Sequence, residues 1–237
     1  MPVTKIISST FFNTFFLACA SIIFALIFGV LFGVVSALAK DSFFDRFLLY
    51  FSVVGMALPS FFSSIIVAWV FGYLLHNYTG LNMYGSLYEL DDYGVSNSLV
   101  LKNLILPAFT LGIRPLAVIV QLSRNSLLEV LSMDYIRTAH AKGLNKKIVI
   151  FKHALRNSLN PVITAVSGWF ASLLAGAVFV EYIFAWDGLG KEIVDALNNM
   201  DLPVVMGSVL FISVIFIVIN ILVDIIYMLV DPRIKIE

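Results

Sequence analysis

Long apolar runs dominate this chain and decide what it can fold into. Five segments each hold the roughly twenty apolar residues that a helix needs to cross the hydrocarbon core of a bilayer. Hydrophobic residues make up 60% of the 237 residues and charged residues only 13%, which excludes a soluble domain of this size. The sequence therefore predicts an all-α, polytopic helical membrane protein with about five spans, at residues 11–39, 47–75, 104–130, 161–183 and 204–230.

The distribution of charge predicts how the spans are oriented. Lys and Arg concentrate after the first span, in the loop 134–160 and near the C-terminus, whereas the loop 181–201 carries five acidic residues against one lysine. Because basic loops stay on the cytoplasmic side, we expect the loop 134–160 and a C-terminal tail, 231–237, in the cytoplasm. Residues 1–8 then form an external N-terminal tail, and residues 9–230 form the transmembrane domain of a multi-pass protein in the cytoplasmic membrane.

The loop 134–160 is basic and amphipathic. Apolar residues at helical spacing predict one apolar helix face, made of Leu144, Ile148, Phe151, Leu155 and Leu159. The remaining arc holds Lys146, Lys147, Lys152, His153 and Arg156. Gly143 permits a turn between two short helices and would present Ala139, Gly143 and Leu144 at a corner. From the residues alone, such a loop either lies on anionic lipid or docks a protein partner.

The order of residues in this loop resembles the EAA loop of bacterial ABC importer permeases. The pattern is Arg137-Thr138-Ala139, then Gly143, then His153-Ala154-Leu155. The sequence of the loop, RTAHAKGL followed by KHALRNSLNPVIT, is similar to that of the dipeptide, oligopeptide and nickel branch of this family. The stretch VFVEYIFAWDGLG resembles the B-type permeases of that branch. The resemblance covers essentially the whole chain and implies a type I ABC importer permease fold. By that resemblance, the chain is expected to lack the family's usual first span, either as a fragment or as a variant.

The resemblance also implies a function and partners. It implies the permease subunit of an ATP-driven importer that moves peptides, or similar small solutes such as nickel or its chelates, by alternating access. The implied partners are two ABC ATP-binding subunits that hold ATP and Mg, a homologous second permease, and an external solute-binding lipoprotein or periplasmic protein. It assigns coupling to the ATPases to Arg137, Thr138, Ala139, Gly143, Leu144, His153 and Leu155.

We expect no catalytic, nucleotide, metal or nucleic acid site in this chain. The stretch GLGK is not a phosphate-binding loop, because Glu192 follows it where a Ser or Thr would bind magnesium. The intramembrane serines have no matching base, and Cys19 stands alone. No metal-ligand spacing joins His76, His140 and His153. These patterns argue against an intramembrane enzyme, and the lack of inverted repeats argues against a self-contained secondary carrier.

Of the ionisable residues inside the predicted spans, we consider two, Arg114 and Asp224. An ionisable group in hydrocarbon is expensive and usually faces a cavity or a partner. Arg114, beside Pro115 in the outer half of its span, either attracts a peptide carboxylate in the substrate pathway or extends its long side chain outward to the interface. For Asp224 we expect a structural hydrogen bond.

Two local patterns predict packing. Gly29 and Gly33 form a GxxxG step, which we expect to pack against another helix of the same chain. Tyr182, Phe184 and Trp186 follow the fourth span, where aromatic side chains gather at the membrane interface.

Overall fold

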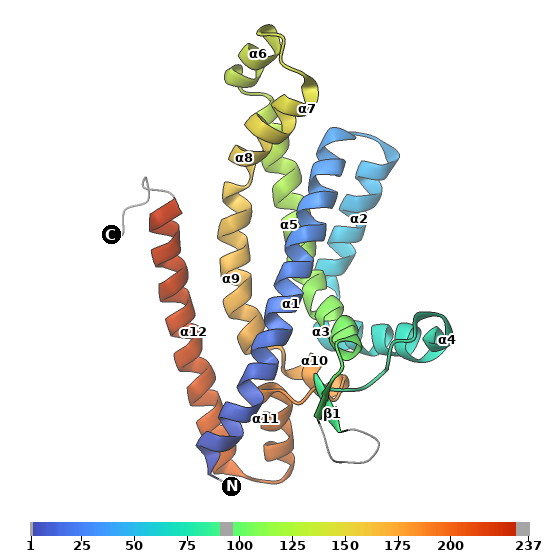
Figure 1. Cartoon of the computed structure of the whole chain (residues 1–237), viewed down its shortest axis with the longest axis vertical. Helices are drawn as coiled ribbons and strands as arrows, with labels where there is room; N and C mark the ends of the chain where they lie inside the picture. The colour runs from blue at the N-terminus through green and yellow to red at the C-terminus, as the bar shows by residue number, and fades with distance from the viewer. Residues whose placement is uncertain (1, 91–96, 231–237) are drawn as a thin grey trace. The chain divides into compact units, whose positions relative to one another are not determined.

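The computed structural model describes residues 2–90 and 97–230 and is helical apart from one small hairpin (Figure 1). The helices are α1 (Val3–Leu38), α2 (Phe43–Ala57), α3 (Ser60–Val67), α4 (His76–Thr79), α5 (Lys102–Leu131), α6 (Asp134–Ala141), α7 (Lys146–Ile148), α8 (Leu155–Ser158), α9 (Asn160–Gly176), α10 (Val178–Ile183), α11 (Leu189–Asn198) and α12 (Leu202–Val230). Two segments are π-helical, η1 (Ala68–Leu74) and η2 (Val149–Ala154). Strands β1 (Tyr88–Leu90) and β2 (Asn97–Leu99) pair antiparallel, with Tyr88 opposite Leu99. The predicted all-α class is confirmed.

The chain divides into two compact units. Unit 1 comprises Met1–Ile23, Leu58–Gly112 and Gly168–Glu237, and unit 2 comprises Phe24–Ala57 and Ile113–Ser167. Helices α1, α5 and α9 each contribute one part to unit 1 and the other part to unit 2. The whole of the loop 134–160 therefore belongs to unit 2.

Three helices in the described part of the chain are long and apolar enough to cross a membrane. They are α1, α5 and the Leu202–Val223 part of α12, and they correspond to the predicted spans 11–39, 104–130 and 204–230. Helix α9 is apolar but shorter, because the helix ends at Gly176 and α10 begins separately at Val178. The predicted fourth span, 161–183, is therefore interrupted.

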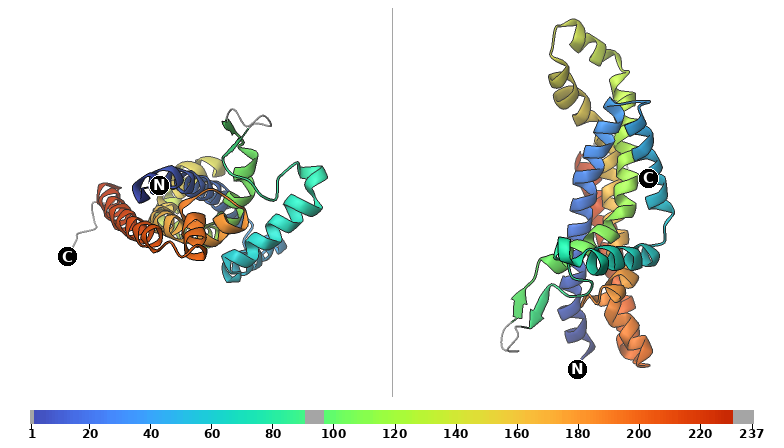
Figure 2. Two further views of the ribbon diagram at one scale, coloured as in Figure 1. Left: turned by 90° about the horizontal axis from the view of Figure 1, so that it is seen from below. Right: turned by 90° about the vertical axis from the view of Figure 1, so that its right-hand side faces the viewer.

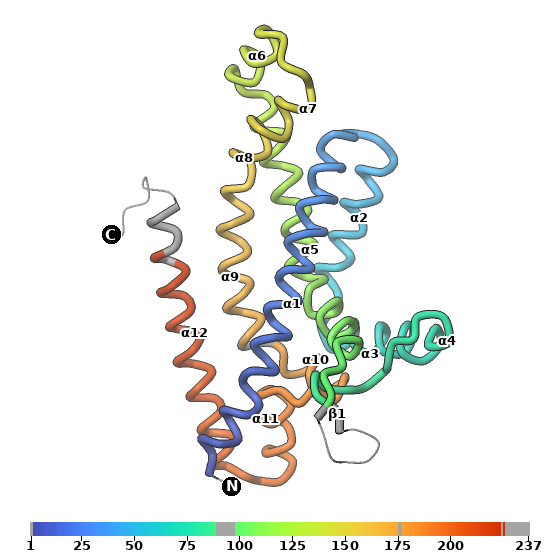
Figure 3. The backbone as a smooth tube through the Cα atoms, in the orientation of Figure 1, coloured from blue at the N-terminus to red at the C-terminus, as the bar shows by residue number. Residues whose placement is uncertain are grey.

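The predicted second span, 47–75, is wrong as one continuous helix. Helix α2 ends at Ala57, and Pro59 adopts an extended backbone (φ −62°, ψ 141°) before α3. Proline has no N–H to donate to the preceding turn, and it disfavours helical geometry in the residue before it. The break can be followed along the tube in Figure 3. The pair counts as one span only if this bend is ignored.

Within unit 2, the second half of α1 packs closely on the second half of α5, and α2 lies beside them (Figures 1 and 2). A Cβ added at Gly29 would lie 2.7 Å from Cγ2 of Ile119, and one added at Gly33 would lie 2.8 Å from the carbonyl oxygen of Val120. Only glycine permits so close an approach. The predicted packing of the GxxxG step within the chain is confirmed.

Within unit 1, the three aromatic residues at the end of α10 and just after it differ in exposure. Trp186 and Phe184 are fully buried, whereas Tyr182 is exposed. Ala185 has a left-handed backbone (φ 52°) that turns the chain back, and Trp186 Nε1 donates to the carbonyl oxygen of Asn13 at 3.1 Å. The predicted interfacial position is wrong for Phe184 and Trp186, because this turn carries both side chains into the interior.

Glu181 is also buried, although the sequence places it among the external acidic residues. Its Oε2 accepts hydrogen bonds from the backbone N–H groups of Gly190 at 2.7 Å and Lys191 at 3.2 Å. These are free donors of the first turn of α11, so the carboxylate caps that helix. A Cβ at Gly188 would overlap the carboxylate, so glycine is needed there.

Candidate functional site

The candidate site is the loop 134–160 together with the helix ends that hold it. Its first helix, α6, buries Ile136 and Ala139 and exposes Arg137 and Thr138. Arg137 Nη1 lies 3.3 Å from Asp134 Oδ1, but both side chains are largely exposed and the pair stabilises the helix little. Of the residues that the family resemblance assigns to coupling, Ala139 is therefore not presented at a surface corner as expected. It holds the helix in place instead.

Gly143 ends α6 in the way that the sequence predicts. Its backbone is left-handed (φ 78°), and its N–H donates to the carbonyl oxygen of His140 at 2.9 Å. The N–H of Leu144 donates to Ala139 at 3.3 Å. This pair of bonds is the Schellman ending of a helix, in which glycine avoids the steric cost of the left-handed residue. A Cβ at Gly143 would meet nothing within 4 Å, so the space in front of this corner is open.

The second half of the loop does not form one regular helix. Helix α7, whose N-terminus is capped by the Asn145 side chain through a 3.1 Å bond from the Lys147 N–H, passes into η2 and then α8. The buried residues are Val149, Ile150, Ala154 and Ser158. Of the five residues of the predicted apolar face, three are exposed, Leu144 at 36%, Ile148 at 46% and Phe151 at 61%, and Leu155 and Leu159 are half-buried. A π-helical segment has i→i+5 bonding, so the 3.6-residue period that predicts the face does not hold through it.

A buried apolar cluster fastens both halves of the loop to α1 and α5 within unit 2. We call it the loop cluster. Its buried members are Val34 and Ala37 of α1, Leu127 and Val130 of α5, Ile136 and Ala139 of α6, and Val149 and Ala154 of η2. Leu155 packs against it from the side, and His153 is half-buried. Any displacement of the loop must therefore move the ends of α1 and α5 or break this cluster.

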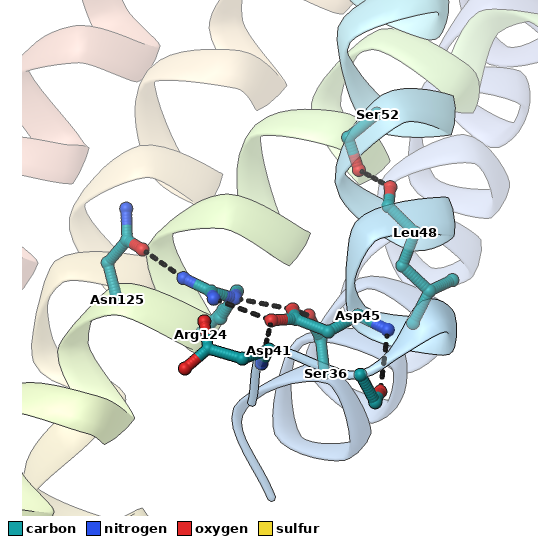
Figure 4. Close-up of polar contacts among 8 residues, drawn as sticks. Ser36, Asp41, Asp45, Leu48, Ser52, Arg124 and Asn125 are labelled. Carbon is teal, nitrogen blue, oxygen red and sulfur yellow. Dashed lines mark hydrogen bonds and ion pairs between the residues drawn. The ribbon is translucent and has the colours of Figure 1, made fainter. Parts of the chain in front are cut away.

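A buried ion pair joins the same helix ends (Figure 4). Arg124 of α5 donates from Nε to Oδ1 of Asp45 at 2.7 Å and from Nη2 to Oδ2 at 2.7 Å, a bidentate geometry. The Ser36 hydroxyl on α1 donates to Asp45 Oδ1, and the N–H of Asp41 donates to Oδ2 at 2.9 Å. The side chains of Asp45 and Arg124 are only 2% and 13% exposed. This network ties α1, α2 and α5 together one turn from the loop cluster.

Sequence reasoning missed this ion pair, although a signal was present. Arg124 lies inside the predicted span 104–130, and Asp45 lies just before the preceding predicted span, 47–75. A charge at membrane depth calls for a partner of opposite sign. The two residues are 79 positions apart, so the sequence offers the two charges but not their pairing.

The remaining predicted residue, Arg114, lies apart from the loop. It is exposed on α5, and no hydrogen bond or ion pair reaches its guanidinium from the described residues. The side chain of Asp224, for which the sequence predicts a structural hydrogen bond, lies outside the described part of the structure. Among the described residues, no group of three His, Cys, Asp or Glu side chains is placed to hold a metal ion.

Known proteins are similar in sequence to this chain over most of its length. The chain is 38% identical to the dipeptide transport system permease protein DppB of Alkalihalophilus pseudofirmus, with 85% of this chain and 64% of that protein covered. It is 40% identical to the di/tripeptide transport system permease protein DppB of Pseudomonas aeruginosa, with 92% and 69% covered. It is 37% identical to the dipeptide transport system permease protein DppB of Escherichia coli K12, with 99% and 74% covered. The chain thus spans 64% and 69% of the length of the first two relatives.

Solved structures share the fold. The inward-facing MetNI methionine ABC transporter matches with a TM-score of 0.75 at 15% identity, over 98% of this chain and 99% of that chain. An amino acid ABC transporter crystallised with histidines matches with a TM-score of 0.67 at 12% identity, over 98% and 95%. The fold is that of a type I ABC importer permease. Residues 29–236 match the family described as binding-protein-dependent transport system inner membrane component, and the chain belongs to that family.

Proposed function

We propose that this chain is the permease subunit of an ATP-driven importer that moves dipeptides or similar short peptides across the cytoplasmic membrane. The observation that carries the proposal is its 37–42% identity to permeases named for dipeptide or di/tripeptide transport, over 85–99% of this chain. The sequence of the loop 134–160 also resembles the dipeptide, oligopeptide and nickel branch of the family. Longer peptides, glutathione-like compounds and nickel or its chelates are the competing solutes.

In this proposal the loop 134–160 is the coupling segment. Two ATP-binding subunits, which hold ATP and Mg, contact its open corner, where Arg137, Thr138, Gly143 and Leu144 are exposed. The buried members of the coupling set act differently, because Ala139 and Leu155 fasten the corner to α1 and α5. Closure of the ATPases would thus pull on the helices of unit 2. A second, homologous permease and an external solute-binding protein complete the transporter.

The structure adds nothing in favour of an intramembrane enzyme or a secondary carrier. The exposed basic arc, which includes Lys146, Lys147 and Lys152, favours an acidic partner, and anionic lipid is the alternative occupant. A loop that merely rests on lipid would retain transport when its open corner is altered. Variants at Gly143, described below, distinguish the two.

The proposed orientation can be tested by labelling single cysteines in a Cys19→Ser background. We expect an impermeant maleimide to reach Asn198→Cys in intact cells and to reach Lys147→Cys only after permeabilisation. Labelling of Thr4→Cys in intact cells would place the N-terminal tail outside. The reverse pattern at Lys147 and Asn198 would contradict the orientation.

The solute is tested by uptake. The chain would be produced with a second permease, two ATPases and a solute-binding protein of the same transporter type, in cells without peptide uptake of their own. We expect ATP-dependent uptake of a labelled dipeptide that unlabelled dipeptides suppress and nickel chelates do not. Suppression by nickel chelates alone would reject peptides as the solute, and failure to co-purify an ATPase would reject the importer itself.

A further inference from the structure

Helix α5 exposes the wrong kind of side chain for a helix in contact with lipid. From Ile113 to Leu131, the exposed residues are Arg114, Asn125 and Glu129, and all three are polar. Helix α5 is nevertheless one of those apolar enough to span a membrane. Gln121 is half-exposed in the same stretch.

These polar residues share one face. The positions 114, 118, 121, 125 and 129 are separated by steps of three or four residues, so in an α-helix they fall within an arc of about 80°. Val118, which is half-buried, is the one apolar member. We call this arc the polar face of α5.

The neighbouring helix of the same unit shows what a lipid-compatible face looks like. Between residues 24 and 38, the exposed side chains of α1 are all apolar: Leu26, Ile27, Phe28, Leu31, Val35 and Leu38. Hydrocarbon cannot satisfy exposed amides and charges, so such groups at membrane depth face a water-filled cavity or a polar partner. The polar face of α5 therefore does not face lipid.

The donors on this face have free hydrogen-bonding capacity. Within the described structure, Arg114 has no hydrogen-bonding partner, and the Asn125 side chain accepts from Arg124 Nη1 at 3.3 Å, which leaves its NH₂ group free. Gln121 Nε2 contacts only the thioether sulfur of Met56, at 3.4 Å, and sulfur is a weak acceptor. Within the described structure, a guanidinium and two side-chain amides of this face thus keep N–H donors without strong acceptors.

Because the chain is proposed above to move peptides, we infer that the polar face of α5 lines the solute pathway and contacts the peptide directly. Arg114 binds the peptide's carboxylate, and the amide of Gln121 hydrogen-bonds its backbone. Asn125, about 17 Å from Arg114 along the helix axis, hydrogen-bonds the peptide at a later position along the pathway. The rise from Arg114 to Gln121 is about 10 Å, the length of three extended residues at roughly 3.4 Å each. A tripeptide held by Arg114 therefore reaches the amide of Gln121, and a dipeptide, about 7 Å long, meets the two residues in turn. Glu129 lies about 22 Å from Arg114 along the helix axis, so it attracts the peptide's ammonium group only after the peptide has moved along the face.

Water accessibility tests the face without assuming any solute. Cysteines would be placed at Gln121 and Asn125 in a Cys19→Ser background, with Ile27→Cys on the apolar face of α1 as the matched control. We expect a small, water-soluble thiol reagent to label Gln121→Cys and Asn125→Cys in membranes and to leave Ile27→Cys unlabelled. Labelling of Ile27→Cys alone, or of none of the three in the assembled transporter, would overturn the inference and indicate an interface closed by another protein chain.

Solute contact is tested by uptake per membrane-inserted permease. Gln121→Leu and Asn125→Leu should each lower uptake of a dipeptide about three- to tenfold, and Val118→Leu on the same face should not. ATPase co-purification should be unchanged in all three variants. If the parent imports dipeptides and both leucine variants match it, the inference fails and the proposed function stands. If the parent imports none while both cysteines react with the aqueous reagent, the proposed solute fails and the pathway face stands.

Discussion

Helix α5 carries two arginines in two contrasting regions. Arg124 is largely buried and makes a bidentate pair with Asp45, whereas Arg114, ten residues earlier, is exposed and has no partner among the described residues. An arginine guanidinium is thus paired within the protein at position 124 and exposed without a described partner at position 114. The contrast separates residues that hold unit 2 together from residues that we propose act on something outside the chain. Ala139 and Gly143 show the same contrast in the loop 134–160, because Ala139 is buried and Gly143 faces open space.

The largest expected effect is the loss of stability when the buried pair of Arg124 and Asp45 is broken. Arg124→Met leaves the Asp45 carboxylate buried without its partner, and breaking such a pair costs about 3–5 kcal/mol. We expect a large fall in the amount of folded protein extracted in detergent and in its melting temperature. Arg114→Met is the matched control and should leave both unchanged. Equal melting temperatures for the two variants would show that the Asp45 pair does not hold the helices.

Replacing both members of the pair sharpens this prediction. In the double variant Asp45→Asn with Arg124→Gln, no charge is left uncompensated. Its melting temperature should recover much of the loss seen in Arg124→Met. A double variant as unstable as the single one would assign the effect to lost packing by the long arginine side chain.

The next effect concerns the open corner of the loop. Gly143→Asp adds bulk and a negative charge where the chain itself leaves more than 4 Å of free space, so it should abolish uptake and ATPase co-purification while membrane insertion persists. Gly143→Asn is the matched control, because asparagine has the same size and tolerates the left-handed backbone. If close approach matters, Gly143→Asn should also lose most of its uptake. Coupling of ATP hydrolysis to uptake at the parent rate in Gly143→Asp would remove the docking role from this corner.

A smaller and selective effect is expected at the exposed Arg114. Arg114→Gln should weaken uptake of free-acid peptides about ten- to hundredfold, the value of a charge-assisted hydrogen bond, and should affect C-terminally amidated peptides much less. Arg114→Lys should be intermediate, because an ammonium keeps the charge but loses the bidentate fork. The measurement is uptake normalised to inserted permease. Equal losses for acid and amide peptides would mean that Arg114 serves as an interfacial anchor.

The smallest effect is expected where an ion pair is exposed on both sides. Asp134→Asn removes the partner of Arg137, but solvent screens this pair and its contribution to stability is slight. Melting temperature and uptake should match the parent. A clear loss of uptake with unchanged melting temperature would reveal that Asp134 itself contacts a partner.

What the sequence predicts well is what depends on local spacing. The positions of α5 and α12 follow from apolar runs, as does that of α1 apart from its start, which lies at Val3 and not at residue 11. The turn at Gly143 follows from a glycine after a short helical pattern, and the packing of Gly29 and Gly33 follows from their four-residue step. Each of these features involves neighbours along one helix. Helical periodicity and backbone freedom therefore suffice to predict them.

What the sequence does not predict depends on distant contacts or on departures from the regular period. The pairing of Asp45 with Arg124 and the burial of Trp186 against Asn13 join residues far apart in the chain. The π-helical segment η2 departs from the 3.6-residue period, and no pattern in the sequence predicts it. The polar face of α5 is present in the sequence spacing, but its meaning depends on knowing which side of the helix the protein leaves uncovered.

The central claim is that the loop 134–160 couples ATP hydrolysis to solute movement through its open corner. The most direct measurement uses proteoliposomes that contain the complete transporter and its binding protein, with ATP hydrolysis and uptake of a labelled dipeptide recorded together. We expect ATP-dependent uptake for the parent. For Gly143→Asp we expect no uptake, although the same amount of permease is inserted. Uptake by Gly143→Asp at the parent ratio of peptide moved to ATP hydrolysed would contradict it.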